Sequence, residues 1–175
     1  MNESIYQLLE SDHRELDELM DEAFSAIRSA DKDLAYSRLD LFWARLAMHI
    51  RAEHVRLFPA LRHVAERSGR ADTLELLTEM RHDHDFFMRE LARAIKAMRL
   101  VFHFGNEAET FETVTGILVA VRDRLALHNR IEEEKIYPLV NPGILSDTDA
   151  EQVVQAVRKE LDNYPQRLAG GAAGP

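Results

Sequence analysis

The chain has 175 residues, of which 46% are hydrophobic and 30% charged, with a formal net charge of -9 and no cysteine. This length and apolar content predict one domain with a single core, and the acidic balance argues against nucleic acid as a partner. Without cysteine, the chain can form no disulfide, thiolate zinc site, iron–sulfur cluster or cysteine nucleophile of its own.

The first predicted helix begins near Asn2 and Ser4, either of which can cap it, and carries apolar residues at helical spacing as far as Ile27. Its start lacks the basic region and apolar run of a signal peptide. No stretch of the sequence approaches a membrane-spanning length. A cytoplasmic protein without a membrane partner is therefore expected.

The second and third predicted helices follow a break over residues 29–33. The second covers about residues 34–61, and Pro59 should kink or end it. After a turn at Ser68 and Gly69, Asp72 can cap a third helix that should fade near Phe104.

The last two helices complete the fold prediction. A fourth helix runs from about Glu107 to Pro138, and the loop NPGILSD follows it. Ser146 with Asp149 resembles a capping box for a short fifth helix over residues 147–168, and residues 169–175 are expected to be a disordered tail. Four long helices with short connections predict an all-α, antiparallel up-and-down four-helix bundle, a single domain over residues 1–168 with the fifth helix packed outside.

An eleven-residue pattern occurs twice, as HIRAEHVRLFP from His49 and as HNRIEEEKIYP from His128. Each copy has a glutamate four places after the histidine, an aromatic residue nine places on and a proline ten places on. Histidine and glutamate at this spacing lie on one helix face, about 6 Å apart along the axis. Because a buried imidazole and carboxylate need a partner, the two copies predict a metal site.

Helix phase adds further inward-facing histidines. His13 lies on the apolar stripe of the first helix, and His84 lies in phase with the apolar residues of the third, whereas His82 has mainly polar neighbours. The predicted metal ligands are therefore His13, His49, Glu53, His84, His128 and Glu132. No residue is predicted to be catalytic.

Six ligands exceed the needs of one tetrahedral zinc and lack the all-oxygen character of a calcium or magnesium site. Two non-haem iron ions are predicted, bridged by Glu53 and Glu132, with or without an additional oxo bridge. The remaining histidines and aromatic residues are not predicted to be ligands. Glu133 is considered as a neighbour of the ligands. Core packing is assigned to Tyr137, Trp43 and Phe86, and positions at helix surfaces or ends are assigned to His54, His63 and His103.

At this point the chain resembles the hemerythrin-like family, also called the HHE cation-binding domain. The resemblance covers roughly residues 3–140 and rests on SDHREL around His13, HIRAEH with LFP at His49, DHDFFMREL at His84, and HNRIEEE with IYP at His128. It implies a four-helix bundle with a di-iron centre that interacts with dioxygen, nitric oxide or peroxide. It carries iron ligation onto the same six residues.

The chain departs from the oxygen-carrying members of that family. Those carriers have a second histidine one turn after the position of His84, where Met88 stands here, and an aspartate in the fourth helix. The set of four histidines and two glutamates resembles more closely the bacterial members that sense oxygen or nitric oxide, handle iron or repair iron centres. His54 stands where the motif often has a second acid, so the resemblance also makes it a candidate for an added or substitute ligand.

The resemblance favours a protein that binds a diatomic ligand or peroxide in sensing, iron handling or stress protection over a dedicated enzyme. The acidic composition and the single bundle are compatible with a monomer or a homodimer. An enzyme that reduces peroxide or nitric oxide, or a repair factor for iron centres, is the alternative. The spacing of Glu10 with His13 and Glu79 with His82 also allows a ferritin-like carboxylate oxidase. A metal-free bundle used for protein interaction is the remaining possibility.

Overall fold

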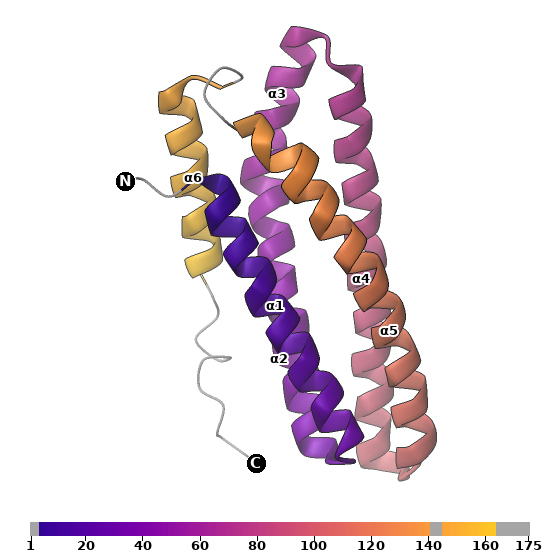
Figure 1. The fold of residues 1–175 in the computed structure, drawn as a ribbon. Coiled ribbons are helices and arrows are strands. Elements are labelled where there is room, and N and C mark those ends of the chain that lie inside the picture. The colour runs from indigo at the N-terminus through magenta and orange to yellow at the C-terminus, as the bar shows by residue number, and fades with distance from the viewer. Residues whose placement is uncertain (1–3, 141–144, 164–175) are drawn as a thin grey trace.

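The computed structural model describes residues 4–140 and 145–163, and these form the all-α bundle that the sequence predicts. Its elements are α1 (Ile5–Arg28), α2 (Lys32–Ala52), the π-helical turn η1 (Glu53–Leu57), α3 (Phe58–Ser68), α4 (Ala71–Phe104), α5 (Glu107–Ile131), a second π-helical turn η2 (Glu132–Ile136), the 3-10 turn η3 (Tyr137–Val140), and α6 (Asp147–Asp162). In Figure 1 the chain runs up and down through the four long helices, with α6 outside them beside the start of α1. Helix α1 packs on α2 and α5, and α4 packs on α2 and α5.

Most helix ends follow from local chemistry. Ser4 and Gln7 form a capping box at the start of α1, and the Asp31 side chain accepts from Leu34 N at the start of α2. Gly69, at φ 67°, ends α3 in the left-handed conformation that favours glycine. The predicted cap at Asp72 is wrong, because α4 begins at Ala71, directly after the Gly69 turn, and Asp72 lies in its first turn instead.

The last helix begins as predicted. The Ser146 hydroxyl accepts from Asp149 N, and α6 runs from Asp147 to Asp162. Asn163 is its C-cap, and Pro165 follows two residues later in the sequence, a common position for proline after a helix. Asn2, the loop residues 141–144, the predicted helix end at 164–168 and the predicted tail at 169–175 lie outside the described residues, as does the side chain of His103.

Pro59 does not end the second long helix, which continues through η1 into α3. In an α-helix a proline ring clashes with the carbonyl four residues earlier. Here the Phe58 N–H bonds to the carbonyl of Glu53, five residues back, so the helix widens by one residue just before the proline. The second copy of the eleven-residue pattern repeats this, because Tyr137 N–H bonds to the carbonyl of Glu132 ahead of Pro138.

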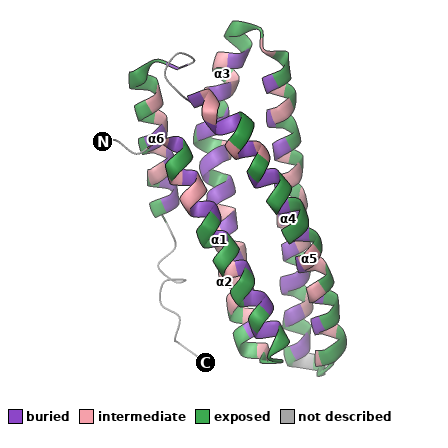
Figure 2. Cartoon of the chain, viewed as in Figure 1, coloured by how far each residue is buried: buried purple, intermediate pink, exposed green. Residues whose placement is uncertain are grey.

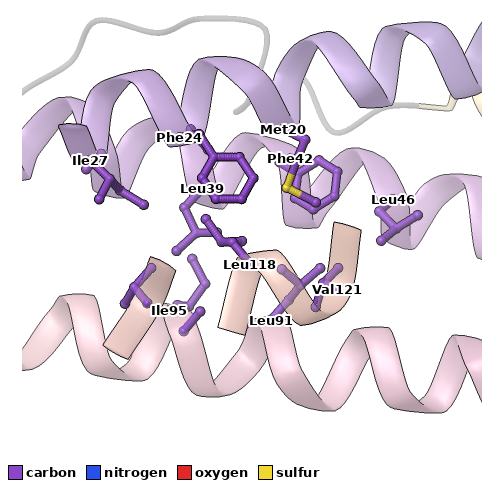
Figure 3. Close-up of a cluster of buried hydrophobic side chains, with 14 of the residues drawn as sticks. Met20, Phe24, Ile27, Leu39, Phe42, Leu46, Leu91, Ile95, Leu118 and Val121 are labelled. Atoms are coloured by element: carbon purple, nitrogen blue, oxygen red, sulfur yellow. The ribbon is translucent and has the colours of Figure 1, made fainter. Parts of the chain in front are cut away.

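Two apolar clusters fill the interior, and buried faces of all four long helices line it (Figure 2). The larger cluster occupies the half of the bundle that contains the α1–α2 and α4–α5 connections, where Phe24, Phe42 and Leu118 pack between the helix pairs (Figure 3). The smaller cluster lies at the other end, around Phe58, and includes Val157 on the inner face of α6. Along α1, α4 and α5, the predicted metal ligands fall between the residues of one cluster and those of the other, and on the second long helix His49 and Glu53 lie where the two clusters meet.

Helix α6 is held against the bundle by a buried carboxylate. Glu160 accepts from Arg51 Nε at 3.1 Å and from Arg56 Nε at 3.0 Å. These arginines flank Glu53, so α6 is fastened to the turn that carries one of the predicted ligands. Within the described residues, no helix is long and apolar enough to cross a membrane.

Candidate metal centre

The structure brings all six predicted ligands together in the middle of the bundle. Each is buried, and two groups of potential ligands form, with Glu53, His84, His128 and Glu132 in one and His13, His49 and Glu132 in the other. Helices α1 and α4 each supply one histidine, while the α2–η1 and α5–η2 segments each supply a histidine and a glutamate. The assignment of these six as ligands remains a prediction, now supported by their juxtaposition.

The ferritin-like alternative is not assembled. Glu79 and His82 are exposed on α4, and Glu10 pairs with Arg14 on the outer side of α1. Of the four residues in the two ExxH pairs, only His13 joins the cluster. His84, rather than His82, is the histidine that α4 places inside.

The histidines meet in two pairs through their Nε2 atoms. His13 and His49 face one another with 3.3 Å between these nitrogens, and His84 and His128 with 2.9 Å. Two ligands bound about 2.1 Å from one ion, at right angles to each other, lie about 3 Å apart. Each pair therefore has the spacing of neighbouring ligands on one cation.

Each glutamate directs one oxygen toward each histidine pair. Glu53 Oε1 lies 3.6 Å from His49 Nε2, and its Oε2 lies 3.3 Å from His84 Nε2. Glu132 Oε2 lies 3.4 Å from His13 Nε2, and its Oε1 lies 3.1 Å from His128 Nε2. Both carboxylates thus have the orientation that bridges two cations.

Two aspartates that precede ligand histidines orient the other histidines. Asp12, just before His13, lies 2.7 Å from His49 Nδ1, and Asp83, just before His84, lies 3.1 Å from His128 Nδ1. A carboxylate at Nδ1 keeps the proton there and turns Nε2 toward the interior. The dipeptide Asp-His, present twice in the sequence, was the available signal for these two residues.

The remaining two histidines are oriented by the residues that follow the glutamates. Glu133 Oε1 lies 2.8 Å from His13 Nδ1, in agreement with its consideration as a neighbour of the ligands. His54 Nε2 lies 2.8 Å from His84 Nδ1, so His54, which was assigned to a helix surface or end, is half-buried and contacts a predicted ligand. Burial, together with the charges of His84 and Arg81, lowers the pKa of His54 to about 4, and its neutral ring can accept the His84 N–H.

The carboxylates and histidines of the cluster shift one another's pKa values. Burial alone would lower the pKa of His128, but Glu132 and Asp83 outweigh it and raise that pKa to about 10. Burial and Glu53 would raise the pKa of Glu132, but His128 and His13 lower it to about 2. Because a metal cation must displace protons from the imidazoles, its affinity rises as the pH rises through the raised histidine pKa values.

Two unsatisfied oxygens show that the donor set fits a cation. Glu53 Oε2 and Glu132 Oε1 are buried and accept no hydrogen bond, although both lie close to histidine nitrogens. A buried carboxylate oxygen without a partner is costly, and a cation bound by both would remove that cost. Imidazole nitrogen with carboxylate oxygen suits iron, manganese or zinc.

Tyr137 belongs to the cluster rather than only to the core, contrary to its assignment from sequence. Its hydroxyl lies 3.1 Å from His13 Nε2 and donates to Glu53 Oε1 at 3.0 Å or to Glu132 Oε2 at 3.1 Å. Phe58 holds the equivalent place in the first copy of the pattern and stacks on His84, with 5.8 Å between ring centres. Only one of the two histidine pairs therefore faces a hydroxyl.

The outer carboxylates should tune metal affinity. We expect Asp12→Asn to lower the affinity for Co²⁺ about 10- to 100-fold, because His49 loses the charged acceptor that orients its ring and raises its basicity. Competition with a chromophoric chelator measures this change. Glu15→Gln, at the exposed second partner of Arg45, is the matched control. Equal affinity in wild type and Asp12→Asn would contradict the role given to Asp12.

Comparison with protein families identifies one match. The model of the hemerythrin HHE cation binding domain matches residues 4–140, which includes all six predicted ligands and both π-helical turns. The match ends at Val140, so α6 lies beyond it. Searches of curated proteins and of solved structures gave no match.

Proposed function

Because the chain belongs to the hemerythrin HHE cation-binding family, we propose that its buried cluster holds two non-haem iron ions and binds dioxygen, nitric oxide or peroxide. The observation that carries this proposal is the orientation of Glu53 and Glu132, each with one oxygen toward each histidine pair. Two imidazoles and one oxygen from each glutamate would hold each ion, and an ion with so few protein ligands would be able to bind a small molecule. The ions would supply the redox chemistry.

The chain's own residues hold and shield the centre. The two apolar clusters close it from both ends of the bundle and exclude bulk water. Asp12, Asp83, Glu133 and His54 fix the rings of the four histidines from outside. Such a rigid and dry site favours reversible binding, as in a sensor, an iron-handling protein or a stress-protection protein.

Reduction of peroxide or nitric oxide is the second candidate, and Tyr137 favours it. Such a reduction needs protons and hydrogen-bond donors at the centre, and the Tyr137 hydroxyl lies within hydrogen-bond reach of both carboxylates. Burial and these carboxylates raise the pKa of Tyr137, so its hydroxyl keeps its proton and would donate a hydrogen bond to a reacting ligand. Glu133, whose side chain is 27% exposed, connects His13 with the solvent and would provide a route for protons.

Metal content and spectroscopy test the proposal. Protein produced with ample iron and purified in air should contain about two irons per chain and show the charge-transfer bands of an oxo-bridged pair. The reduced protein should form a stable adduct with nitric oxide, whereas steady-state consumption of peroxide or nitric oxide would favour the enzyme. Protein without any bound transition metal under these conditions would rule out both candidates.

A further inference from the structure

The cluster is built from two similar halves. In one half, the dipeptide Asp12-His13 on α1 faces the His49 motif on α2, and in the other, Asp83-His84 on α4 faces the His128 motif on α5. In both halves the aspartate orients the partner helix's histidine, and the residue after each glutamate orients a histidine of the opposite half. The two halves therefore form an internal two-fold arrangement.

The halves differ at two positions that contact the histidines. Glu133 corresponds to His54, and Tyr137 corresponds to Phe58. Both differences change the surroundings of His13 and His84: an acid and a hydroxyl lie against His13, whereas an imidazole and a phenyl ring lie against His84. Two positions with the same ligand types are thus placed in different environments.

Of the two positions, the one between His84 and His128 is better arranged to bind a cation. Its four ligand atoms all lie within 4.8 Å of one another, whereas the His13–His49 position gathers three. The carboxylate oxygens that face it, Glu53 Oε2 and Glu132 Oε1, lie 3.3 Å from His84 Nε2 and 3.1 Å from His128 Nε2 and accept no hydrogen bond from a hydroxyl group. A cation entering here replaces histidine protons but displaces no hydroxyl group.

At the His13–His49 position, the ligand atoms already have a hydrogen-bond partner. The oxygens that face it, Glu53 Oε1 and Glu132 Oε2, are those within hydrogen-bond distance of the Tyr137 hydroxyl. The same hydroxyl lies 3.1 Å from His13 Nε2. A cation bound to these atoms must replace the hydroxyl as their partner.

We propose that the two metal positions fill in order, first between His84 and His128 and then between His13 and His49, with the Tyr137 hydroxyl weakening the second step. This inference rests on the proposed two-metal centre. It makes Tyr137 the residue that determines the difference in metal affinity between the two positions. A hydrogen bond to a charged acceptor corresponds to about 10- to 100-fold in an equilibrium constant, which is the expected gap between the two steps.

Anaerobic titration of the metal-free full chain with Co²⁺, followed by calorimetry and visible absorption, tests the order. Wild-type protein should bind in two unequal steps. His128→Ala should remove the tight step, whereas His13→Ala should leave it and remove the weak one. Loss of the tight step in His13→Ala with its retention in His128→Ala would overturn the order, as would two equal steps in wild type.

The hydroxyl is tested by a matched pair of substitutions. Tyr137→Phe copies the residue found at Phe58 and should bring the second step to within a few-fold of the first. Phe58→Tyr should weaken the first step. Loss of the second step in Tyr137→Phe would make the hydroxyl a ligand and overturn its role as competitor. Absence of Co²⁺ binding by wild type would instead count against the two-metal centre itself.

Discussion

Glu132→Gln is expected to empty the centre of both cations. Glu132 belongs to both groups of ligands, and its two oxygens face opposite histidine pairs. An amide has one weak oxygen ligand and an N–H₂ group that repels a cation, so both positions lose a charged ligand. Bound iron should fall from about two per chain to nearly none. The loss of a direct ligand should lower metal affinity by more than the 10- to 100-fold that follows the loss of an outer hydrogen-bond partner.

Elemental analysis of protein purified from iron-rich cultures measures this loss, and circular dichroism shows whether the bundle remains helical. Glu134→Gln provides a close control, since Glu134 lies in the same π-helical turn but is exposed. It should retain the wild-type iron content. A Glu132→Gln protein that keeps both irons would show that Glu132 is not a bridging ligand.

Phe87→Ala is expected to lower the free energy of unfolding of the metal-free protein by about 3–5 kcal/mol, the usual cost of removing a buried phenyl ring. Phe87 is 0% exposed and belongs to the larger apolar cluster. Its ring also packs edge-on against His128, at 5.3 Å between ring centres. The cavity would therefore open beside a predicted ligand, and metal affinity should fall together with stability.

Urea-induced unfolding, followed by circular dichroism, measures the change in stability. Leu127→Ala is the control, because Leu127 is 57% exposed although it neighbours His128 in sequence. Its effect should stay within about 0.5 kcal/mol, as for most surface substitutions. A loss below about 1 kcal/mol in Phe87→Ala would mean that the surrounding side chains collapse into the space of the ring.

Helical periodicity was sufficient to predict the bundle and to select the six predicted ligands, which the structure brings together. His13 and His84 were found because residues three and four places away are apolar, and the same phase separated His84 from His82. This works because α-helical geometry holds from each helix start to the ligand positions. The all-α prediction and the family are confirmed.

Tyr137 was missed because α-helical geometry stops at Glu132. Five residues of α-helix turn a side chain about 140° away from the starting face. The π-helical turn from Glu132 to Ile136 absorbs one residue and returns Tyr137 to the face of Glu132, within hydrogen-bond distance. The prolines that follow both aromatic residues were interpreted as kinks or ends, although they mark these turns.

The outer residues were harder to predict, because their partners lie on other helices. Asp12 contacts His49, 37 residues away, and His54 contacts His84, 30 residues away. Helix phase places a side chain on a face but does not determine which side chain of a neighbouring helix it meets. Such pairings depend on the relative heights of the helices, which only the folded chain determines.

The position of the cluster between two separate apolar cores has a topological consequence. Residues 13 and 132, at opposite ends of the described bundle sequence, are neighbours here. Each cation would be bound by residues of three long helices, and the two cations together by residues of all four, so they would act as cross-links that close long loops of the chain, as disulfides do in other proteins. In a chain without cysteine, bound metal would thus be a reversible cross-link, and its binding would make the two apolar clusters unfold as one cooperative unit.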